Sequence, residues 1–394
     1  MKYWRGYLVA AILGAIAWGL TALAKRYTAL VDMVFPYVTR TVQGFLADWS
    51  GSVNFCVWQV VLVLALVLCL ATLVLMIILR WNFIQWLGWV LSGVMLVYLM
   101  HTGLYGLNYY AGPLAEDVRL TVSEYTLDEL QDAVVYYRNQ ANTLADQMPR
   151  SDNGDLQYSD FATLAEQAGE GFQVLTYENC YPVFAGSTKP VKELGWADLY
   201  SSIGITGITI GVTGEAAVNP QIPCVALPFT MCHEMAHRMS IVNERDANFS
   251  AFLACRANSS LEFQYSAYFM AYLYSMNTLS AISTPEAATA AARIATGINE
   301  NFSHDLNAYF QFFDEKYDEN ATNLADLAND TYLKASGDDG VESYDNVGDL
   351  LVYLYIQDVV LPAQKEDAKS TFDPYDENQV DLEGIVGALP KEAP

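Results

Sequence analysis

The sequence predicts a membrane-anchored, mainly α-helical protein, with three N-terminal transmembrane helices followed by a mostly helical domain with a small β-sheet. Composition and charge distribution point to this class. Of the 394 residues 53% are hydrophobic, although the formal net charge is −25. Residues 1–111 hold six basic and two acidic side chains, whereas the rest of the chain holds 14 basic and 43 acidic ones. An apolar, slightly basic head therefore precedes a strongly acidic body.

Three stretches of the head have the length and composition of transmembrane helices, at about 6–24, 55–79 and 83–104. A bilayer core of about 30 Å needs roughly 20 helical residues. The first stretch has an alternative interpretation as a cleaved signal peptide, but no small-x-small site precedes a polar mature start. Tryptophans lie near the ends of the spans, as interfacial aromatic residues do. They are Trp49, Trp58, Trp81, Trp86 and Trp89.

The orientation in the cell membrane is predicted from the N-terminus. Positive charges alone are nearly balanced between the two sides of the membrane. A short basic segment with Lys2 and Arg5 precedes the first apolar stretch, which is typical of a signal anchor. We therefore expect a cytoplasmic N-terminus, and three spans then place the body outside the cell.

The segment between the first two spans, Tyr27–Trp49, has apolar residues at helical spacing. Two interpretations stay open. One is an amphipathic helix in the membrane interface, and the other is a short helix packed on the body. The apolar residues are Val31, Val34, Phe35, Val38, Val42, Phe45 and Leu46.

The body, about 112–365, is predicted to be mostly helical. The β-branched, glycine-containing segment Ile203–Val212 predicts one strand with close backbone approach. Residues 366–394 predict an acidic, loosely ordered tail. Apolar periodicity and start signals predict a helix that begins at Thr230 and others at about 246–258, 262–282, 285–313 and 345–360.

The charge pattern also bears on partners. Phosphate contacts require clustered lysine and arginine side chains, and the acidic body offers none. Nucleic acid is therefore excluded as a partner. The lipid bilayer is the expected partner of the head.

The chemistry is concentrated in His233-Glu234-Met235-Ala236-His237. Two histidines at i and i+4 lie on one helix face, so that their imidazoles can converge on one Zn²⁺ ion. Glu234 can then take a proton from a zinc-activated water. The alternative is a pair of surface histidines beside a glutamate.

A third metal ligand has to come from outside this helix. Ser240–Asn243 are expected to form a turn, and Glu244 to open the returning helix. Asn248 follows Glu244 by one helical turn and is expected to orient its carboxylate from the second coordination shell. Asp246 is the alternative ligand. We prefer Glu244 because of this asparagine.

The run Leu227–Cys255 resembles an uncharacterised family of bacterial membrane proteins with a gluzincin-like zinc metallopeptidase signature. The segments Gly106–Asp117, Gly214–Asn219 and Gln264–Tyr268 resemble that family too, and its members share a three-span anchor. The resemblance implies a zincin-like domain outside the membrane. It also implies the site residues: His233, His237 and Glu244 as Zn²⁺ ligands and Glu234 as the base.

The chain departs from the family pattern at three positions. Arg238 and Ser240 stand where the pattern has Gln and Gly, and Asp246 replaces a Glu. A missing glycine at 240 bears on how sharply the turn can bend.

The predicted function is peptide-bond hydrolysis of a peptide or protein substrate. The segment Ile205–Val212 can offer a sheet edge to an extended peptide. Tyr265 or Tyr268 is a candidate donor to the developing oxyanion. The alternative function is a catalytically silent scaffold that binds zinc or a peptide at the membrane surface.

Overall fold

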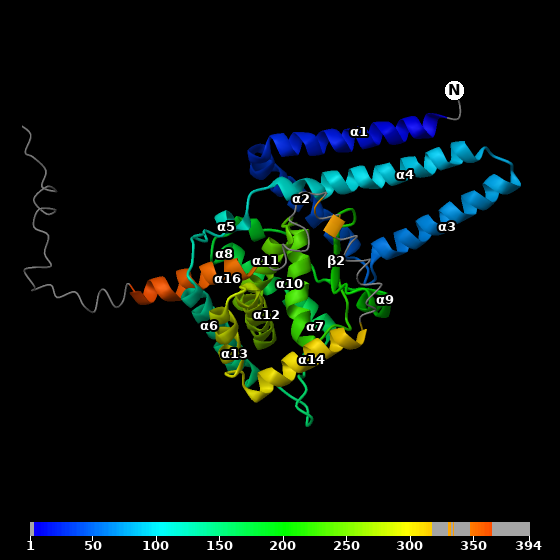
Figure 1. The fold of residues 1–394 in the computed structure, drawn as a ribbon. Helices are drawn as coiled ribbons and strands as arrows, with labels where there is room; N and C mark the ends of the chain where they lie inside the picture. Colours follow the sequence, from blue (N-terminus) through cyan, green and yellow to red (C-terminus); the bar gives the residue numbers. More distant parts are fainter. Residues whose placement is uncertain (1–3, 317–329, 332–333, 335–346, 365–394) are drawn as a thin grey trace, which may run out of the picture.

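Three long apolar helices extend from a helical body in the computed structural model (Figure 1). The structure describes residues 4–316, 330–331, 334 and 347–364. It is mainly helical, with one three-stranded sheet among the described residues. The predicted fold class is thereby confirmed. The predicted tail, 366–394, lies outside the described residues.

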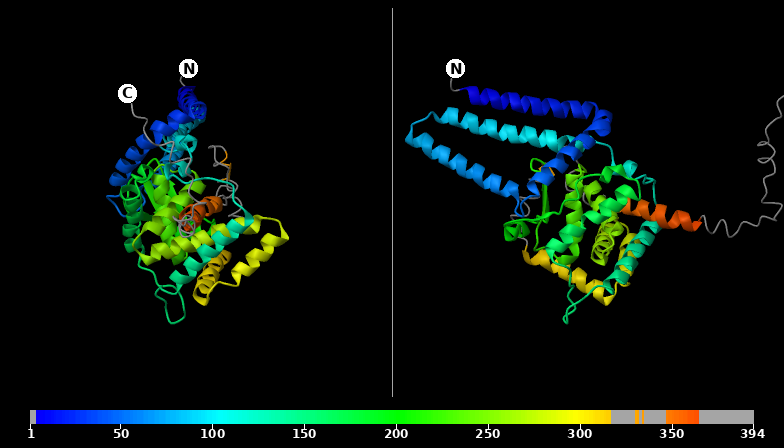
Figure 2. Two further views of the ribbon diagram at one scale, coloured as in Figure 1. Left: turned by 90° about the vertical axis from the view of Figure 1, so that its left-hand side faces the viewer. Right: turned by 180° about the vertical axis from the view of Figure 1, so that it is seen from behind.

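The three apolar helices are α1 (Arg5–Arg26), α3 (Val57–Ile78) and α4 (Phe83–Leu104). Each has 22 residues and is long and apolar enough to cross a membrane. Their bounds agree with the predicted spans to within two residues. Figure 2 shows from behind that α3 and α4 form a hairpin whose two arms separate toward the body.

Helices α1 and α4 pack closely because small residues face each other. A Cβ atom on Gly6 would lie 2.4 Å from the carbonyl carbon of Gly88. The Ser92 hydroxyl donates a hydrogen bond of 2.7 Å to the Gly6 carbonyl oxygen. Small side chains let helix backbones approach in this way within a bilayer. Helix α3, in contrast, buries few of its side chains.

The segment between the first two spans forms helix α2 (Thr28–Ser50), which packs on the body through its polar face. Arg40 donates hydrogen bonds to the carbonyl oxygens of Met239 and Pro182. Gln43 donates to the carbonyl oxygens of Leu104 and Gly211. Several large apolar side chains of α2 are exposed; they include Leu30, Met33, Tyr37, Val38, Phe45 and Trp49.

The sheet is small and has the strand order β1-β3-β2. Strand β3 pairs in parallel with β1 and antiparallel with β2, with Thr209 opposite Ala216. Strand β2 is therefore an edge strand among the described residues. It is shorter than the predicted Ile203–Val212, because the chain turns into β3 through Gly214, whose φ of +66° is in the left-handed region. The strands are β1 (Lys192–Glu193), β2 (Gly207–Ile210) and β3 (Glu215–Val218).

The centre of the body is formed by α10, which lies between the sheet and two further helices, α11 and α12. Helix α6 covers α12 on its other side and begins with a capping box of Thr126 and Glu129. The buried core runs continuously through these helices. Their bounds are α6 (Leu127–Ala145), α10 (Leu227–Arg238), α11 (Glu244–Ala257) and α12 (Leu261–Ala281).

The prediction of a single helix at 285–313 is wrong. The structure has two helices there, α13 (Pro285–Ala295) and α14 (Glu300–Lys316). Asn299 accounts for the break. Its Oδ1 atom accepts a hydrogen bond from the Phe302 N–H, and its amide donates to the Asn142 carbonyl oxygen. An asparagine that caps in this way fixes the start of a new helix at Glu300.

The remaining elements are short. They are α5 (Leu114–Asp117), α7 (Phe161–Gln167), α8 (Gly169–Tyr177), α9 (Ala197–Ser202), α16 (Val347–Tyr355), the 3₁₀ segments η2 (Gly106–Tyr110), η3 (Pro182–Phe184) and η4 (Cys224–Ala226), and the π-helical turn η6 (Ile356–Val360).

Candidate metal centre

Helix α10 carries the two histidines of the motif on one face. It begins at Leu227, three residues before the predicted Thr230, because Pro228 fits the first helical turn, where its missing N–H costs nothing. The rings of His233 and His237 are 4.5 Å apart between centroids. Met235, between the two histidines in sequence, is fully buried in the core, so the helix is anchored there.

A tight turn brings the next helix back toward these histidines. Helix α11 begins at Glu244, and the Asn243 side chain caps it by accepting from the Asp246 N–H. Ser240 adopts a φ of +73°, which explains why glycine would suit this position. Its hydroxyl lies 2.9 Å from the hydroxyl of Thr39 on α2. The turn therefore keeps its sharp bend with serine, and helix α2 supports it.

The turn places a carboxylate between the two imidazoles. The Glu244 Oε2 atom is 3.2 Å from His233 Nε2 and 3.5 Å from His237 Nε2. The potential ligand atoms of these three residues lie within 4.8 Å of one another. Two histidines and one carboxylate form a ligand set that is found in catalytic zinc sites.

The hydrogen bonding of this group fits a bound cation. Among the described residues the buried Glu244 Oε2 atom has no hydrogen-bond partner of good geometry. The Nδ1 atom of His237 is 2.9 Å from the Ile241 carbonyl oxygen. That carbonyl can only accept, so Nδ1 carries a proton, and in the neutral imidazole the lone pair on Nε2 is the one available to a cation beside Glu244.

Without a metal, the Glu244 carboxylate and the two imidazoles shift one another's pKa values. Burial lowers the pKa of His237, but the Glu244 carboxylate outweighs burial and raises that pKa to about 9. Burial raises the pKa of Glu244, but the two imidazoles lower it well below its ordinary value. A bound cation would replace the proton that the imidazole and the carboxylate otherwise share.

Glu234, on α10, has its side chain held against strand β2. Its Oε2 atom accepts a hydrogen bond of 2.7 Å from the Thr209 hydroxyl. A Cβ atom on Gly207 would lie only 2.4 Å from Glu234 Oε1, so glycine is needed for this close approach. Burial raises the pKa of Glu234, and the neighbouring His233 and His237 lower it; the net shift is upward.

These residues share a cavity of about 710 Å³. Its floor is α10, and the consecutive residues 203–211 form a wall that includes β2. His101 near the end of α4 and Tyr105 directly after it form another side. The Tyr105 ring is 6.3 Å from the His237 ring, so the third apolar helix ends directly beside the candidate metal centre (Figure 1).

Comparison with known proteins places the chain in a family. A family model described as a protein of unknown function, DUF3810, matches residues 33–352. The chain belongs to the DUF3810 family. No curated protein and no solved structure matches the chain. The family description assigns no activity, so the function of this DUF3810 protein has to be argued from the chemistry of its site.

Two further predicted residues are the alternative ligand Asp246 and the supporting residue Asn248. Asp246 accepts hydrogen bonds from the Leu114 N–H and from Arg245, and it is not among the three grouped ligands. Asn248 lines the cavity. Its Oδ1 atom accepts from the Tyr274 hydroxyl rather than contacting Glu244 by a described hydrogen bond.

The tyrosines predicted as oxyanion donors do not line the cavity. Tyr265 is fully buried and donates a hydrogen bond of 2.5 Å to Asp305, which also pairs with Arg150. Tyr268 packs against Phe252 and neighbouring tyrosine rings. Both side chains therefore belong to the core of the body in this structure. In the described part of the chain four other tyrosines line the cavity, namely Tyr105, Tyr109, Tyr274 and Tyr309.

Sequence reasoning missed the contribution of Thr209, Gly207 and Tyr105. The segment Gly106–Asp117, which follows the third apolar stretch directly, already stood out as similar to the family. That signal could have directed attention to the adjacent Tyr105. The roles of Thr209 and Gly207 depend on the approach of β2 to α10; the glycines of Ile203–Val212 predicted a close backbone approach, but nothing in the sequence named Glu234 as the partner.

Proposed function

We propose that this DUF3810 protein is a membrane-anchored zinc metallopeptidase. The observation that carries the proposal is the convergence of His233, His237 and Glu244 on one point with Glu234 beside them. In this proposal residues 1–111 are the membrane anchor, 112–365 the catalytic domain and 366–394 a tail. Helix α2 and the end of α4 add walls and support to the catalytic domain.

The three ligand residues would hold Zn²⁺, which when bound supplies Lewis acidity that lowers the pKa of a water and polarises a carbonyl group. Glu234 acts as the general base. It accepts a proton from the attacking water and delivers that proton to the leaving amine. The upward shift of its pKa makes the carboxylate a better proton acceptor near neutral pH. Thr209 fixes its orientation.

Strand β2 offers the surface for the peptide. It is an edge strand, and the segment 203–211 that contains it lines the cavity beside Glu234. An extended peptide can add to such an edge through main-chain hydrogen bonds. In this arrangement the scissile bond lies over α10, within reach of the candidate metal ligands.

The metal assignment is tested with a matched pair of variants. Glu244→Gln and Asp246→Asn each neutralise one buried carboxylate in the first turn of α11. We expect about one zinc per purified wild-type chain. Glu244→Gln should weaken zinc binding at least as much as the roughly 10–100-fold loss that follows removal of a supporting residue, and Asp246→Asn should keep zinc. Absence of zinc from the reconstituted wild type would overturn the proposal.

The peptidase activity is tested with Glu234→Gln on a peptide library. We expect this variant to keep its zinc and to lose hydrolysis by about 10²–10⁴-fold, the usual contribution of a general base. The competing function is a scaffold that binds zinc or a peptide without cleaving. Full zinc occupancy with equal, background-level hydrolysis in wild type and Glu234→Gln would favour the scaffold.

A further inference from the structure

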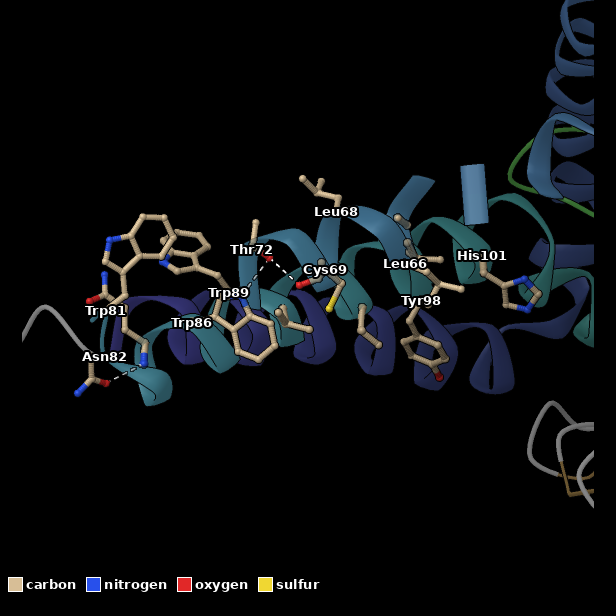
Figure 3. Close-up of a pocket in the computed structure, with 16 residues that line it drawn as sticks. Leu66, Leu68, Cys69, Thr72, Trp81, Asn82, Trp86, Trp89, Tyr98 and His101 are labelled. Carbon is tan, nitrogen blue, oxygen red and sulfur yellow. Dashed lines mark hydrogen bonds between the residues drawn. The ribbon is translucent and has the colours of Figure 1, made fainter. Parts of the chain in front are cut away.

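A second, larger cavity lies between α3 and α4, outside the body. It has a volume of about 1340 Å³ and is lined by residues of these two helices and of the hairpin that joins them. Among the residues that the structure describes, its lining includes no lysine, arginine, aspartate or glutamate. Figure 3 shows Trp81, Trp86, Trp89 and Tyr98 along its length. We call this cavity the α3–α4 groove.

The groove exists because the two helices are attached to the body at different places. The first N–H groups of α3, at Val57 and Trp58, donate to the carboxylate of Glu215 on β3. Helix α4 instead ends beside α10, where Tyr105 faces His237. Near the hairpin the helices stay in contact, since the Trp86 indole donates to the Thr72 hydroxyl. The two arms therefore separate toward the body (Figures 1 and 2).

The groove and the metal cavity are neighbours that share His101 in their linings. This residue, near the end of α4, lines both of them, and Figure 3 shows it at the end of the groove that faces the body. Its ring is 5.5 Å from the Tyr105 ring, which in turn is 6.3 Å from the His237 ring. The end of the groove that faces the body therefore lies close to the candidate metal centre.

The length of the groove selects its occupant. Its lining extends along α4 from Asn82, just before the helix, to His101, which corresponds to about 30 Å of helix at 1.5 Å per residue, and along α3 from Ala65 to Thr72. That length equals the hydrocarbon thickness of a bilayer, about 30 Å. A lipid acyl chain reaches through only one leaflet, whereas a membrane-spanning helix fills the whole length.

We infer that the α3–α4 groove receives a transmembrane helix of the substrate protein and delivers the segment just outside the membrane to the metal cavity. The inference rests on the proposed peptidase function and narrows its substrates to membrane-spanning proteins. The uncharged lining suits a helix within the bilayer. The segment that follows this helix meets the edge of β2, which is positioned for an extended chain.

Occupation of the groove is tested without hydrolysis, by cross-linking to Cys69. This cysteine is free, partly buried and lines the groove near the middle of α3. The probe is a synthetic helix of about 20 leucine and alanine residues with one central cysteine, placed in liposomes with the full chain and oxidised with copper phenanthroline. We expect a disulfide between probe and protein that is lost in Cys69→Ser.

A matched glycine pair shows whether the groove is responsible. A Cβ atom on Gly93 or on Gly19 would meet nothing within 4 Å, but only Gly93 lines the groove. We expect Gly93→Trp to lower the cross-link yield roughly fivefold or more, because the indole takes the place of the probe, and Gly19→Trp to leave it unchanged. Equal yields in both variants, or a better yield with a thiol-bearing lipid, would overturn the inference.

Delivery to the metal cavity is tested with the same probe, extended beyond the membrane by a short peptide that carries a photoreactive benzoylphenylalanine. We expect cross-links within residues 203–211. Cross-links there without hydrolysis by the zinc-loaded wild type would support the groove and count against the peptidase. Hydrolysis of free peptides together with scattered cross-links would support the peptidase and overturn the groove.

Discussion

At the level of single residues, the contact between Thr209 and Glu234 links the sheet to the candidate catalytic helix. The Thr209 hydroxyl donates to the carboxylate at 2.7 Å, and Gly207 provides the space that the carboxylate occupies. The hydrogen bond lowers the pKa of Glu234, in opposition to burial, which raises it. Strand β2 thus has two functions in the proposed enzyme, since it borders the peptide site and sets the basicity of the general base.

Removal of the Thr209 hydroxyl should shift the pH profile. In Thr209→Val the pKa of Glu234 rises further, because the carboxylate loses a donor. A general base works only when deprotonated, so the acid limb of kcat/KM against pH should move to higher pH. A hydrogen bond to a charged group is worth about 1.5–3 kcal/mol, which corresponds to roughly one pH unit or more.

Thr206→Val is the matched control for this measurement, since Thr206 lines the same cavity on the same segment. Its acid limb should stay where it is in the wild type. An equal shift in both variants would mean that the effect comes from the polarity of the cavity rather than from the bond to Glu234.

Zinc binding should release a proton at neutral pH. The pKa of His237 is raised to about 9 beside Glu244, so without metal its imidazole is protonated at pH 7, and zinc binds only the neutral form. We expect release of about one proton from His237 at pH 7, with zinc affinity rising about tenfold per pH unit up to pH 9. Calorimetric titrations in buffers of different ionisation enthalpy measure this release.

The same calorimetric titration at pH 10 provides an internal control. There His237 is already neutral, and its contribution to proton release should disappear. Release that does not change between pH 7 and pH 10 would show that His237 is not a proton-linked ligand.

At the level of elements, Glu215 joins the start of α3 to the sheet. Its two carboxylate oxygens accept from the first N–H groups of α3 at 2.7 and 2.9 Å. Lys192 pairs with the same carboxylate at 2.7 Å and also donates to the carbonyl oxygens of Ser50 and Phe55. A negative charge at a helix N-terminus is favourable. One buried ion pair therefore fixes the direction in which α3 leaves the body.

Loss of this ion pair should destabilise the junction between α3 and the sheet. In Glu215→Ala the buried Lys192 charge loses its partner, at a cost of about 3 kcal/mol, and the helix loses its cap. We expect a lower thermal unfolding midpoint in detergent and faster proteolysis within residues 51–56. The control is Glu193→Ala, which removes an exposed carboxylate from the neighbouring strand; it should behave as wild type.

The sequence predicted elements well where one local pattern decides them. Continuous apolar stretches determine α1, α3 and α4, and the i, i+4 histidines with a glutamate after a short turn predicted a three-residue group that the structure brings together. The sequence did not predict contacts between segments that are distant along the chain. The polar face of α2 is buried only because the body supplies carbonyl oxygens for Arg40 and Gln43, and Tyr265 is directed to Asp305 by the packing of α12 against α14.

At the level of the whole molecule, apolar surface is concentrated on one side of the body. The three long apolar helices leave from there, and the exposed apolar face of α2 contains Leu30, Phe45 and Trp49. A helix whose polar face is buried against protein and whose apolar face is exposed can lie in a membrane interface. Helix α2 can therefore rest on the lipid surface while its polar face supports the turn at Ser240. The candidate metal centre then lies close to the membrane surface.

The side of the membrane that carries the body can be determined with a native cysteine. Cys180 is exposed, whereas the other five cysteines are buried or partly buried. With a cytoplasmic N-terminus, α1, α3 and α4 cross the membrane three times and place Cys180 outside the cell. We expect a membrane-impermeant maleimide to label intact spheroplasts that express the wild-type chain, and Cys180→Ser to abolish that labelling. Labelling only after the membrane is permeabilised would reverse the orientation, and the proposed peptidase would then act on segments at the cytoplasmic face.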